Sequence, residues 1–462
     1  MESDVATLTR AVDGELVYGN ASAHFKGVGI DSRTLAPGQL FVCIQGDRFD
    51  GHQFVQQVLD NKASGVVVSR RESIPMETLK KHNAFAVLVP DTLQALQDLA
   101  ACQRNRLPVR VVGITGTNGK STTKEMIAGI AGVRFQTLKT QGNLNNHIGL
   151  PLSLLELDAS HEVAVLEMGM SAAGEIRRLA EIARPDIGVI TNISEAHMVH
   201  LKTLKQVQAV KGELYEALSA EGTAIVNADD PLVRDLAKGL RARTITYGID
   251  HPADVQASDI SPREPIGFDF TVTLFDQKIT MQLPILGYYN IYNALAAVAT
   301  GHSLGIPSDA MNAGLAEFQM MSQRSEVLHH KSMTLINDAY NANPQSMRQA
   351  LDTLQRFQVA GRKFFVAGDM WELGSLEEEA HLRLGEAVAQ QGLDYFVTVG
   401  PRARLAAESS IKNGMPANRV AALDDHQEAV DYLTRHAKSG DCLLFKGSRG
   451  AQMEKVIEGL MR

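Results

Sequence analysis

Short apolar runs rich in β-branched residues alternate with helical patterns along most of the chain. Four such runs are VRVVGI (109–114), VAVLE (163–167), IGVIT (187–191) and TAIVN (223–227), and each is followed by a helical pattern. Strands that are buried on both faces and joined through helices form parallel sheets. The sequence therefore predicts an α/β protein built on mostly parallel sheets.

A chain of 462 residues is too long for one ordinary core and predicts several domains. The first predicted block, 1–107, holds short strand candidates such as QLFVCI and GVVVS. The second block, 108–320, carries the four runs above and ends in the helical pattern NIYNALAAVATGHSL and a shorter one near Met311. The third block, 321–462, repeats the alternation with MTLIND, KFFVAGD, YFVTVG and CLLFKG, which predicts a second parallel sheet.

Charge and cysteine content exclude several classes of protein. The 45 basic and 53 acidic residues give a net charge of −8, whereas a nucleic-acid binder is more often basic. Cys43, Cys102 and Cys442 lie far apart and form neither a disulfide framework nor a metal-ligand spacing. The N-terminus MESDVATLTR lacks a signal pattern, and no apolar run is long enough to cross a bilayer. We expect a cytoplasmic chain with no nucleic-acid partner and no membrane insertion.

The segment VGITGTNGKSTTKE (112–125) places a glycine-rich loop between a predicted strand and a predicted helix. The usual phosphate loop has Gly, four residues, then Gly-Lys-Ser/Thr, and its first glycine position is Ile114 here. The context still predicts anion binding, because backbone N–H groups and the helix dipole point at the loop. Lys120 would reach the terminal phosphates and Ser121 would hold Mg²⁺. The alternative is a tight turn without a ligand.

Further polar residues follow the next strands. Glu167 ends VAVLE, and Asn192, His197 and His200 follow IGVIT. Ligands bind beyond the carboxyl ends of parallel strands, and Mg²⁺ prefers oxygen ligands. The alternatives are a carboxylate that caps a strand end and structural histidines. Lys211, in QAVKGELYEAL, lies on a predicted helix, and the residues alone favour a solvated lysine there.

These segments, in this order, resemble the ATP-dependent Mur ligases and the related folylpolyglutamate synthase. GTNGKS (116–121) matches the family's phosphate loop, so the mismatch at Ile114 is a family trait. A uridine-nucleotide domain of that family is similar to the segment GIDSRTLAPGQLFVCIQGDRFDGHQFVQQVLDNKASGVVV. Four further segments resemble the branch that adds D-alanyl-D-alanine: KTQGNLNNHIGLPLSLL, INDAYNANPQSM, VAGDMWELG and FKGSRGAQMEKV. The resemblance spans nearly the whole chain.

The resemblance implies three domains: a small N-terminal uridine-nucleotide domain, a central P-loop-type ATPase domain, and a C-terminal Rossmann-like domain that receives the amine. It implies that UDP-N-acetylmuramoyl-tripeptide is joined to D-alanyl-D-alanine through an acyl phosphate, while ATP is cleaved to ADP and phosphate. Two Mg²⁺ ions and a monomeric chain are expected. Whether the tripeptide ends in lysine or diaminopimelate stays open.

The resemblance also assigns residues to ATP. Asn290 and Asn293 fall where the family contacts adenine, Arg324 on its γ-phosphate arginine, and Asp338 on its ribose-contacting aspartate. The remaining residues assigned to ATP form the phosphate loop: Gly116, Thr117, Asn118, Gly119, Lys120 and Ser121.

Metal and peptide contacts are implied in the same way. The implied Mg²⁺ ligands are Ser121, Glu167, His197 and Lys211, the last as a carbamylated lysine. The implied substrate contacts are Ser32 and Arg33 for the uridine nucleotide and Asn143 and Asn146 for the peptide. Lys120, Lys211, His197 and Arg324 are the expected catalytic residues.

Two positions depart from the family pattern, and three rival functions remain. Tyr289 stands where the adenine motif usually has histidine, and Trp371, the only tryptophan, replaces an aliphatic residue and is expected to pack in a core.

A ligase that adds diaminopimelate or lysine would carry a DYAHTP-like stretch, whereas this chain has AYNANPQSM. Folylpolyglutamate synthase would leave the first block unexplained. A nucleotide switch would need fewer of the four residues Lys120, Glu167, His197 and Lys211. Asn341, Asn343 and the FKGSRG segment are plausible neighbours of D-alanyl-D-alanine.

Overall fold

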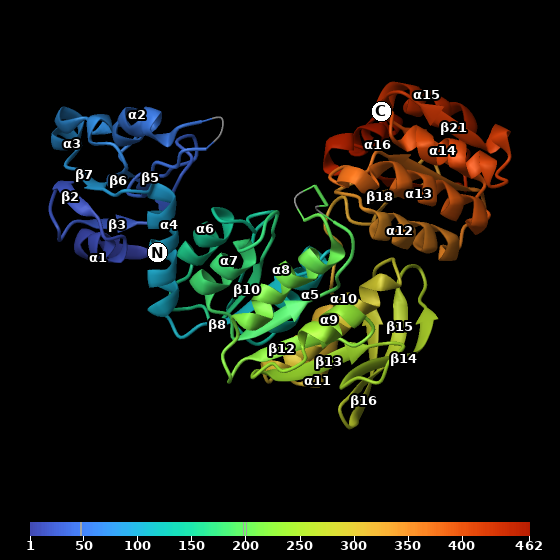
Figure 1. Cartoon of the computed structure of the whole chain (residues 1–462), viewed down its shortest axis with the longest axis horizontal. Helices are drawn as coiled ribbons and strands as arrows, with labels where there is room; N and C mark the ends of the chain where they lie inside the picture. The colour runs from blue at the N-terminus through green and yellow to red at the C-terminus, as the bar shows by residue number, and fades with distance from the viewer. Residues whose placement is uncertain (47–48, 197, 200) are drawn as a thin grey trace.

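The computed structural model describes residues 1–46, 49–196, 198–199 and 201–462. Three α/β lobes follow one another along the chain, with the N-terminal and C-terminal lobes at opposite ends of the central lobe (Figure 1). Each lobe holds its own main sheet, of five, nine and six strands. The predicted α/β class and the predicted three-domain architecture are confirmed.

The N-terminal lobe combines a five-stranded sheet, in the order β2-β7-β6-β5-β4, with the small antiparallel pair β1-β3. β4 to β7 are parallel, and β2 is an antiparallel edge strand. The strands are β1 Glu2–Asp4, β2 Glu15–Tyr18, β3 His24–Lys26, β4 Val28–Gly29, β5 Leu40–Val42, β6 Gly65–Val68 and β7 Phe85–Leu88. The helices are α1 Val5–Ala11, η1 Gly51–Phe54, α2 Val55–Asp60, η2 Arg71–Ser73, α3 Met76–His82 and α4 Thr92–Asn105.

Helix α4 joins the first lobe to the second. It begins after Asp91, whose carboxylate accepts hydrogen bonds from the N–H groups of Leu93 and Gln94 at 2.8 and 3.0 Å, as expected of an N-cap. The helix packs against α6 and α7 of the central lobe. Gln97 on α4 also donates to the carbonyl of His147, at 3.1 Å. The first lobe is therefore attached along a whole helix.

The central lobe is built on a nine-stranded sheet in the order β16-β15-β14-β13-β12-β11-β8-β10-β9. The strands are β8 Arg110–Thr115, β9 Thr137–Lys139, β10 Val163–Glu167, β11 Ile187–Ile190, β12 Thr223–Asn227, β13 Arg243–Gly248, β14 Val255–Pro262, β15 Phe268–Leu274 and β16 Gln277–Leu283. The helices are α5 Lys120–Gly132, α6 Gly149–Leu155, α7 Glu175–Ala183, α8 Leu204–Glu216, α9 Pro231–Leu236, α10 Tyr289–Ser303 and α11 Ser308–Ala316.

Strands β8 to β14 are parallel to their neighbours, as predicted for the inner strands, whereas β14, β15 and β16 form an antiparallel extension. The sequence analysis did not predict this extension. In β15, buried residues alternate with half-buried ones, so the strand shows no continuous apolar run. Figure 1 shows the extension beneath the C-terminal lobe.

The C-terminal lobe carries a six-stranded sheet in the order β17-β18-β22-β19-β20-β21, parallel except for the edge strand β17. The strands are β17 Glu326–His330, β18 Met333–Asp338, β19 Lys363–Gly368, β20 Tyr395–Val399, β21 Val420–Leu423 and β22 Cys442–Lys446. The helices are α12 Pro344–Arg356, η3 Gly374–Leu376, α13 Glu377–Gln391, α14 Ala403–Lys412, η4 Ala417–Arg419, α15 His426–His436, η5 Arg449–Ala451 and α16 Glu454–Met461. The predicted second parallel sheet is confirmed.

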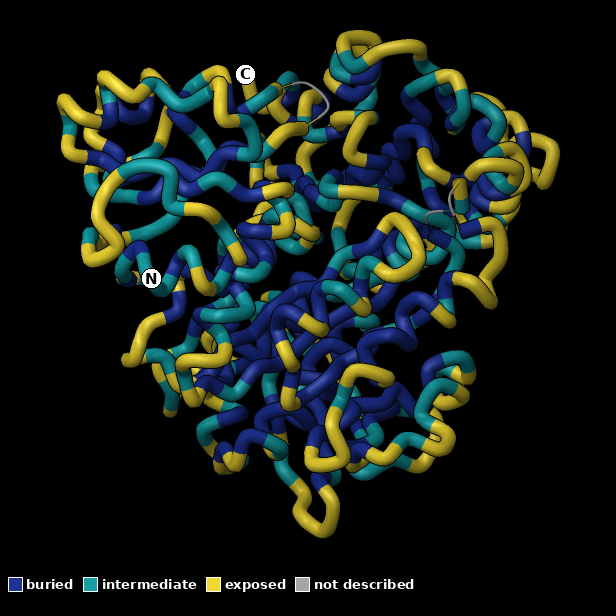
Figure 2. The backbone as a smooth tube through the Cα atoms, turned by 60° about the vertical axis from the view of Figure 1, so that its left-hand side comes forward, coloured by how far each residue is buried: buried dark blue, intermediate teal, exposed yellow. Residues whose placement is uncertain are grey.

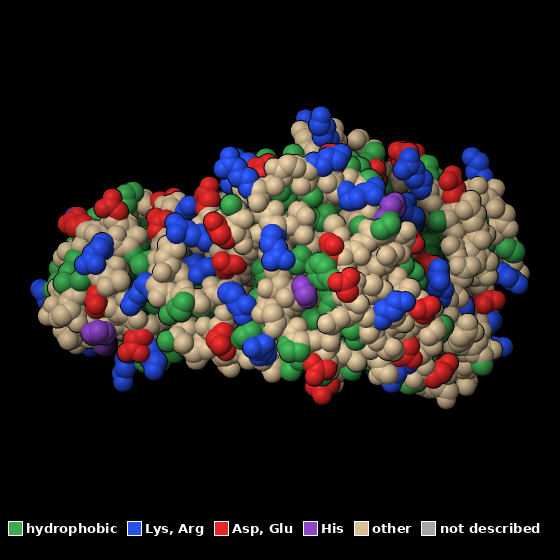
Figure 3. Space-filling view, turned by 90° about the horizontal axis from the view of Figure 1, so that it is seen from below, with side chains coloured by type: hydrophobic (Ala, Val, Ile, Leu, Met, Phe, Trp, Pro, Cys, Tyr) green, Lys and Arg blue, Asp and Glu red, His purple; other side chains and the backbone are tan. Residues whose placement is uncertain are grey.

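The central strands are buried, and exposed residues concentrate in loops and outer helix faces (Figure 2). Figure 3 shows acidic and basic side chains interspersed over the face seen from below. In the described part of the chain, no helix combines the length and the apolar character that a membrane span needs.

Candidate active site

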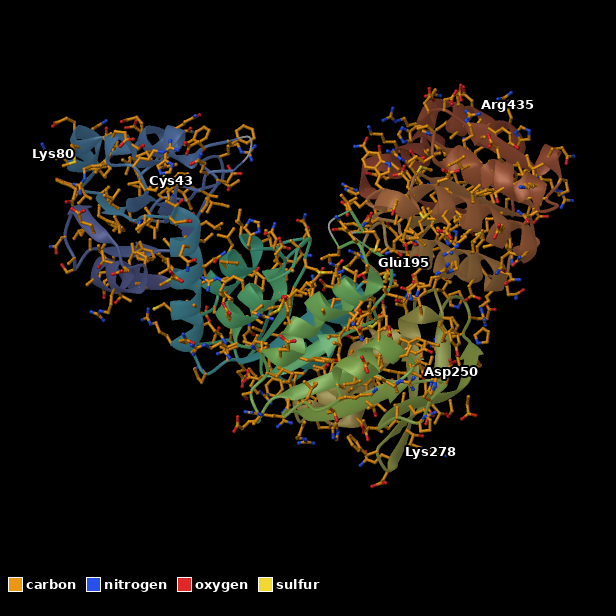
Figure 4. The ribbon with its side chains drawn as sticks, in the orientation of Figure 1. Cys43, Lys80, Glu195, Asp250, Lys278 and Arg435 are labelled. Carbon is orange, nitrogen blue, oxygen red and sulfur yellow. The ribbon has the colours of Figure 1, made fainter. Side chains whose placement is uncertain are left out.

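A cavity of about 600 Å³ lies between the central and C-terminal lobes. Its central-lobe wall includes the glycine-rich loop and the ends of parallel strands, and its other wall includes loops of the C-terminal lobe. Figure 4 places Glu195, next to cavity-lining Ala196, where the two lobes meet. The predicted site residues that line the cavity are Thr117, Asn118, Gly119, Lys120, Ser121, Asn143, Asn146, Glu167, Arg324 and Asp338.

Two glycines allow the loop to turn tightly between β8 and α5. Gly116 has φ +147°, and a Cβ there would lie 1.9 Å from Thr191 Oγ1. Gly119 has φ +82°, and a Cβ there would lie 2.3 Å from Asn293 Oδ1. Larger residues are excluded at both positions by backbone conformation and by space. The shifted glycine pattern is thus a requirement of this loop.

Side chains from the next loop fix the conformation of the phosphate loop. The carbonyl of Asn118 accepts hydrogen bonds from Thr191 Oγ1 (2.6 Å) and Asn192 Nδ2 (2.9 Å). The Asn118 N–H donates to Asn192 Oδ1 at 3.0 Å. Thr191 and Asn192 follow β11, the neighbour of β8. The loop is therefore held in place by protein groups rather than by a ligand alone.

Three polar groups converge at the start of α5. Lys120 Nζ donates to the carbonyls of Gly116 (2.9 Å) and Thr117 (3.1 Å), within its own loop. Burial lowers the pKa of Lys120, the Glu167 carboxylate acts to raise it, and Arg324 acts to lower it. Arg324 Nη2 donates to Ser121 Oγ at 3.0 Å. Two cationic side chains and a helix N-terminus at one end of a cavity form a site for a multiply charged anion.

The guanidinium of Arg324 is itself held by an aromatic ring. Its Cζ lies 4.0 Å from the centre of the Tyr340 ring, a cation–π distance. Arg324 lies between α11 and β17, where the chain passes from the central to the C-terminal lobe. Tyr340 could not be predicted from the sequence, because no spacing rule links it to Arg324.

Glu167 has the properties of a metal ligand. It ends β10, is 2% exposed, and accepts a hydrogen bond from Asn145 Nδ2 on Oε1 at 2.8 Å. Its Oε2 is buried without a hydrogen-bond partner in the described residues. A buried carboxylate oxygen without a partner is costly unless a cation or another donor binds it. Glu167 and the Ser121 hydroxyl both line the cavity, so hard oxygen donors that fit Mg²⁺ are present.

The predicted His197 ligand, and His200, lie outside the described residues. Among the residues that are described, no group of three or more His, Cys, Asp or Glu side chains could bind a metal on its own. Mg²⁺ bound to nucleotide phosphates commonly takes part of its ligand set from the phosphate oxygens.

Lys211 is buried, so the expectation of a solvated lysine is wrong. It lies on α8, which begins at a capping box formed by Thr203 and Gln206, and it is 1% exposed. Burial holds the pKa of Lys211 well below its usual value, and the positive charge of Lys120 lowers it further. The lysine faces the interior because α8 packs on the central sheet. The neighbouring residues in the sequence do not indicate this packing, so the burial of Lys211 could not be predicted from them.

The two asparagines assigned to adenine are used inside the protein. Asn290 Nδ2 donates to the carbonyl of Leu286 (2.6 Å), and Asn293 Nδ2 donates to Asn290 Oδ1 (2.8 Å). Both side chains are buried and neither lines the cavity. Tyr289 does line it, with its hydroxyl 3.0 Å from Ser325 Oγ. Contact between the asparagines and adenine stays a prediction.

Asp338 lies at the end of β18 and forms an ion pair with Lys446, with 2.6 Å between Oδ2 and Nζ. Its Oδ1 accepts a hydrogen bond from the Ser325 N–H at 3.0 Å. Lys446 is 4% exposed and also donates to the carbonyl of Asn341 at 3.0 Å. These bonds fix the carboxylate at the cavity edge, whereas its contact with ribose stays a prediction.

The residues assigned to the UDP-substrate are divided between two places. Ser32 and Arg33 lie in the N-terminal lobe and do not line the cavity, and Arg33 pairs with Asp31 at 2.6 Å. Asn143 and Asn146 line the cavity. Asn146 Oδ1 also accepts the N–H of Gly149, at 2.9 Å, where α6 begins.

Trp371 does not pack in a core, so that expectation is wrong. The residue is 43% exposed and lines the cavity. The residue follows β19 in a loop whose backbone is bonded to Ser448, since the Trp371 N–H donates to Ser448 Oγ at 2.8 Å. This loop stands at the carboxyl end of the C-terminal sheet, where polar backbone rather than core side chains fixes it.

Asparagine and glutamine side chains connect the two lobes beside the phosphate loop. Asn118 Nδ2 donates to Gln345 Oε1 at 2.8 Å, and Asn343 Nδ2 donates to Asn118 Oδ1 at 2.8 Å. Ser194 Oγ also donates to Gln345 Oε1, at 2.6 Å. Asn343 is the N-cap of α12, and Gln345 lies in its first turn. We call Asn118, Ser194, Asn343 and Gln345 the interlobe clasp.

Family models match all three lobes. Residues 24–104 match "Mur ligase family, catalytic domain", residues 114–301 match "Mur ligase middle domain", and residues 323–449 match "Mur ligase, glutamate ligase domain". These segments correspond to the three lobes that the structure shows.

Individual proteins and solved structures agree with the family models. The chain is 39% identical to UDP-N-acetylmuramoyl-tripeptide–D-alanyl-D-alanine ligase of Bacillus subtilis, over 94% of this chain and 93% of the relative. It is 34% identical to the Escherichia coli ligase of the same name, over 99% and 98%. The structure superposes on MurF from Acinetobacter baumannii with a TM-score of 0.90 at 32% identity, covering 100% and 99% of the two chains. For MurF of Thermotoga maritima in complex with ADP the TM-score is 0.84 at 28% identity, covering 94% and 97%. The chain belongs to the Mur ligase family, in the group of UDP-N-acetylmuramoyl-tripeptide–D-alanyl-D-alanine ligases.

Proposed function

We propose that this chain joins D-alanyl-D-alanine to UDP-N-acetylmuramoyl-tripeptide, with cleavage of ATP to ADP and phosphate, in the synthesis of a peptidoglycan precursor. One observation carries the proposal. The anion site at Lys120, Ser121 and Arg324 shares a single cavity with loops of the C-terminal lobe. A nucleotide and an amine substrate bound on different lobes would then meet in one enclosed space.

The first proposed step makes the carboxylate reactive. A carboxylate oxygen of the tripeptide attacks the γ-phosphorus of ATP, ADP leaves, and an acyl phosphate remains. Lys120 and Arg324 stabilise the charge on the transferring phosphoryl group, because both are held in place before the substrate arrives. Ser121, Glu167 and His197 would hold Mg²⁺, and the ion would neutralise negative charge on the phosphates.

Lys211 is proposed to react with CO₂. Its lowered pKa favours the neutral amine, whose nitrogen bonds to the carbon of CO₂ and then loses a proton to solvent. The product is an anionic carbamate with two oxygens, and oxygen ligands suit Mg²⁺. A Lys211→Ala variant should be inactive and should regain activity with small carboxylates such as acetate or formate. Full activity without such an addition would refute the carbamate.

The second proposed step forms the amide. The free amine of D-alanyl-D-alanine attacks the acyl carbonyl, the amine loses a proton, and phosphate leaves with the oxygen that came from the carboxylate. Water would compete for the acyl phosphate. Contact between the lobes through the interlobe clasp supports a closed site that limits this loss.

The remaining expectations belong to the same proposal. We propose a monomer that acts in the cytoplasm, with domains at 1–107, 108–320 and 321–462. Ser32 and Arg33 would contact the uridine nucleotide, Asn143 and Asn146 the peptide, Asn290 and Asn293 adenine, and Asp338 ribose.

A phosphate-release assay tests the function. The protein would be incubated with ATP, Mg²⁺ and the UDP-tripeptide, ending in lysine or in diaminopimelate, and then with either D-alanyl-D-alanine or a free diamino acid. We expect stoichiometric phosphate and a pentapeptide product, identified by mass, with D-alanyl-D-alanine alone. Release only with the diamino acid would assign the chain to the sister ligase. Tight ATP binding without release for either amine would favour a nucleotide switch.

A further inference from the structure

An aromatic surface is left open in the wall of the active-site cavity. Trp371 is 43% exposed and lines the cavity together with Leu373 and Ala342. Leaving so much apolar area in water is unfavourable by about 25 cal/mol per Å². A half-open aromatic ring in a ligand cavity therefore indicates contact with an apolar part of a substrate.

The indole is held in a defined position. The backbone N–H of Trp371 donates to Ser448 Oγ at 2.8 Å, and the backbone N–H of Ser448 donates to the carbonyl of Asp369 at 2.9 Å, so the main chain that carries the ring is fixed. The benzo ring lies directly on Gly450, where an added Cβ would be 1.9 Å from Trp371 Cζ3. The guanidinium of Arg402 lies 5.9 Å from the ring centre. A ring fixed in this way costs little further ordering when a ligand binds.

The ring belongs to the C-terminal lobe, which also contributes Arg324 and Asp338 to the cavity. The phosphate loop forms the central-lobe wall, and Asn143 and Asn146 lie on the same lobe. Trp371 and Gly450 come from the C-terminal lobe, which matches the glutamate ligase domain model. The loop of Trp371 also approaches the central lobe, since a Cβ on Gly374 would lie 3.4 Å from the Met198 carbonyl oxygen.

We propose that Trp371 is a specificity-determining residue that contacts the methyl groups of D-alanyl-D-alanine. The inference rests on the proposed function and adds which surface recognises the amine. The dipeptide has two methyl groups as its only apolar side chains, and a flat ring seated on glycine offers a shallow surface of matching size. The adenine ring of ATP, which could stack on the indole, is the competing occupant of this surface.

Kinetics of a Trp371→Ala variant test this contact. Burial of one methyl group changes binding by about fourfold, so loss of both contacts should raise KM for D-alanyl-D-alanine by about tenfold. KM for ATP and for the UDP-tripeptide should not change. Trp371→Phe should stay close to the parent protein. Ile411→Ala, an exposed apolar residue of α14 outside the cavity, is the matched control and should change nothing.

Truncating the substrate tests the same contact from the other side. Glycyl-glycine lacks both methyl groups, so the parent enzyme should prefer D-alanyl-D-alanine by about tenfold in kcat/KM. In Trp371→Ala this preference should nearly disappear. An unchanged preference would overturn the proposal, because the ring would then not recognise the methyl groups.

A second variant keeps the tryptophan and moves it. Gly450→Ala places a methyl group where the indole stands, so the ring must shift. We expect the same selective rise in KM for D-alanyl-D-alanine. Because Trp371 is the only tryptophan, intrinsic fluorescence of the parent protein reports this site alone. Titration with D-alanyl-D-alanine in the presence of ADP and the UDP-tripeptide should change the emission.

The outcomes separate this inference from the proposed function. If the parent protein does not use D-alanyl-D-alanine at all, the proposed function fails. If the parent protein uses it and Trp371→Ala leaves its KM unchanged in a chain with unaltered thermal unfolding, only the inference fails. A selective rise in KM for ATP would assign the ring to adenine and would also overturn the inference.

Discussion

At the scale of single residues, the sequence predicted those groups whose role is set by their neighbours in the chain. Lys120 and Ser121 follow a glycine loop between a strand and a helix, and the structure places both in the cavity. Lys211 and Trp371 could not be predicted in this way. Burial of Lys211 and exposure of Trp371 follow from how distant elements pack, and a short sequence window does not contain that information.

Lys211→Met should stabilise the protein in CO₂-depleted buffer. The buried amine has a lowered pKa, so the folded chain binds fewer protons than the unfolded chain, and stability rises with pH between the lowered pKa and 10.5. The variant lacks this penalty. We expect a gain of about 1–3 kcal/mol at neutral pH, shrinking as the pH approaches 10.5.

Chemical denaturation of both proteins across that pH range measures this gain, and loss of activity in the variant confirms that the lysine is needed. A variant that is less stable than its parent at every pH would contradict a buried amine whose pKa is lowered by burial.

Lys120→Met should lower kcat by about 10²–10³, because it removes a positive charge that stabilises the transferring phosphoryl group. The measurement is phosphate release at saturating substrates. Lys278→Ala, on the exposed β15–β16 hairpin (Figure 4), is the control and should keep full activity. Equal activity of the two variants would remove Lys120 from the chemistry.

At the scale of elements, the sequence predicted strands that are buried on both faces. VAVLE and TAIVN match β10 and β12 residue for residue. The β14–β16 extension was missed because its strands are not buried on both faces, and β17 was missed because most of its residues are only half-buried. The interlobe clasp was missed for another reason: Asn118 and Gln345 are 227 positions apart, and no local pattern connects them.

Gln345→Leu tests the interlobe clasp. The change keeps the size of the side chain but removes the oxygen that accepts hydrogen bonds from Asn118 and Ser194. Each lost bond is worth about 0.5–1.5 kcal/mol, so kcat/KM should fall by about tenfold. Gln355→Leu, on the exposed side of the same helix, is the control.

A double-mutant cycle separates a clasp from a merely structural role. Because Ser194 and Asn118 share one acceptor, Ser194→Ala should have little further effect in the Gln345→Leu background. Additive effects of the two changes would show that the lobes act independently at this point. Thermal unfolding should be nearly unchanged in both single variants.

At the scale of the whole molecule, the proposed function uses three lobes for three substrates. The first lobe is attached through α4, and the second and third enclose the cavity. The sequence predicted the number and order of the lobes, since each repeats its own set of strands and helices. Their contacts were beyond such reasoning, because they depend on side chains that meet only after the lobes have folded.

The central claim is that the tripeptide carboxylate is activated as an acyl phosphate in this cavity, and oxygen transfer tests it most directly. The terminal carboxylate of the UDP-tripeptide would be labelled with ¹⁸O, and the phosphate released in the presence of ATP and D-alanyl-D-alanine would be examined by mass spectrometry. We expect one ¹⁸O atom in each released phosphate, because the carboxylate oxygen that attacks phosphorus leaves with it. Unlabelled phosphate accompanied by pentapeptide would contradict the account.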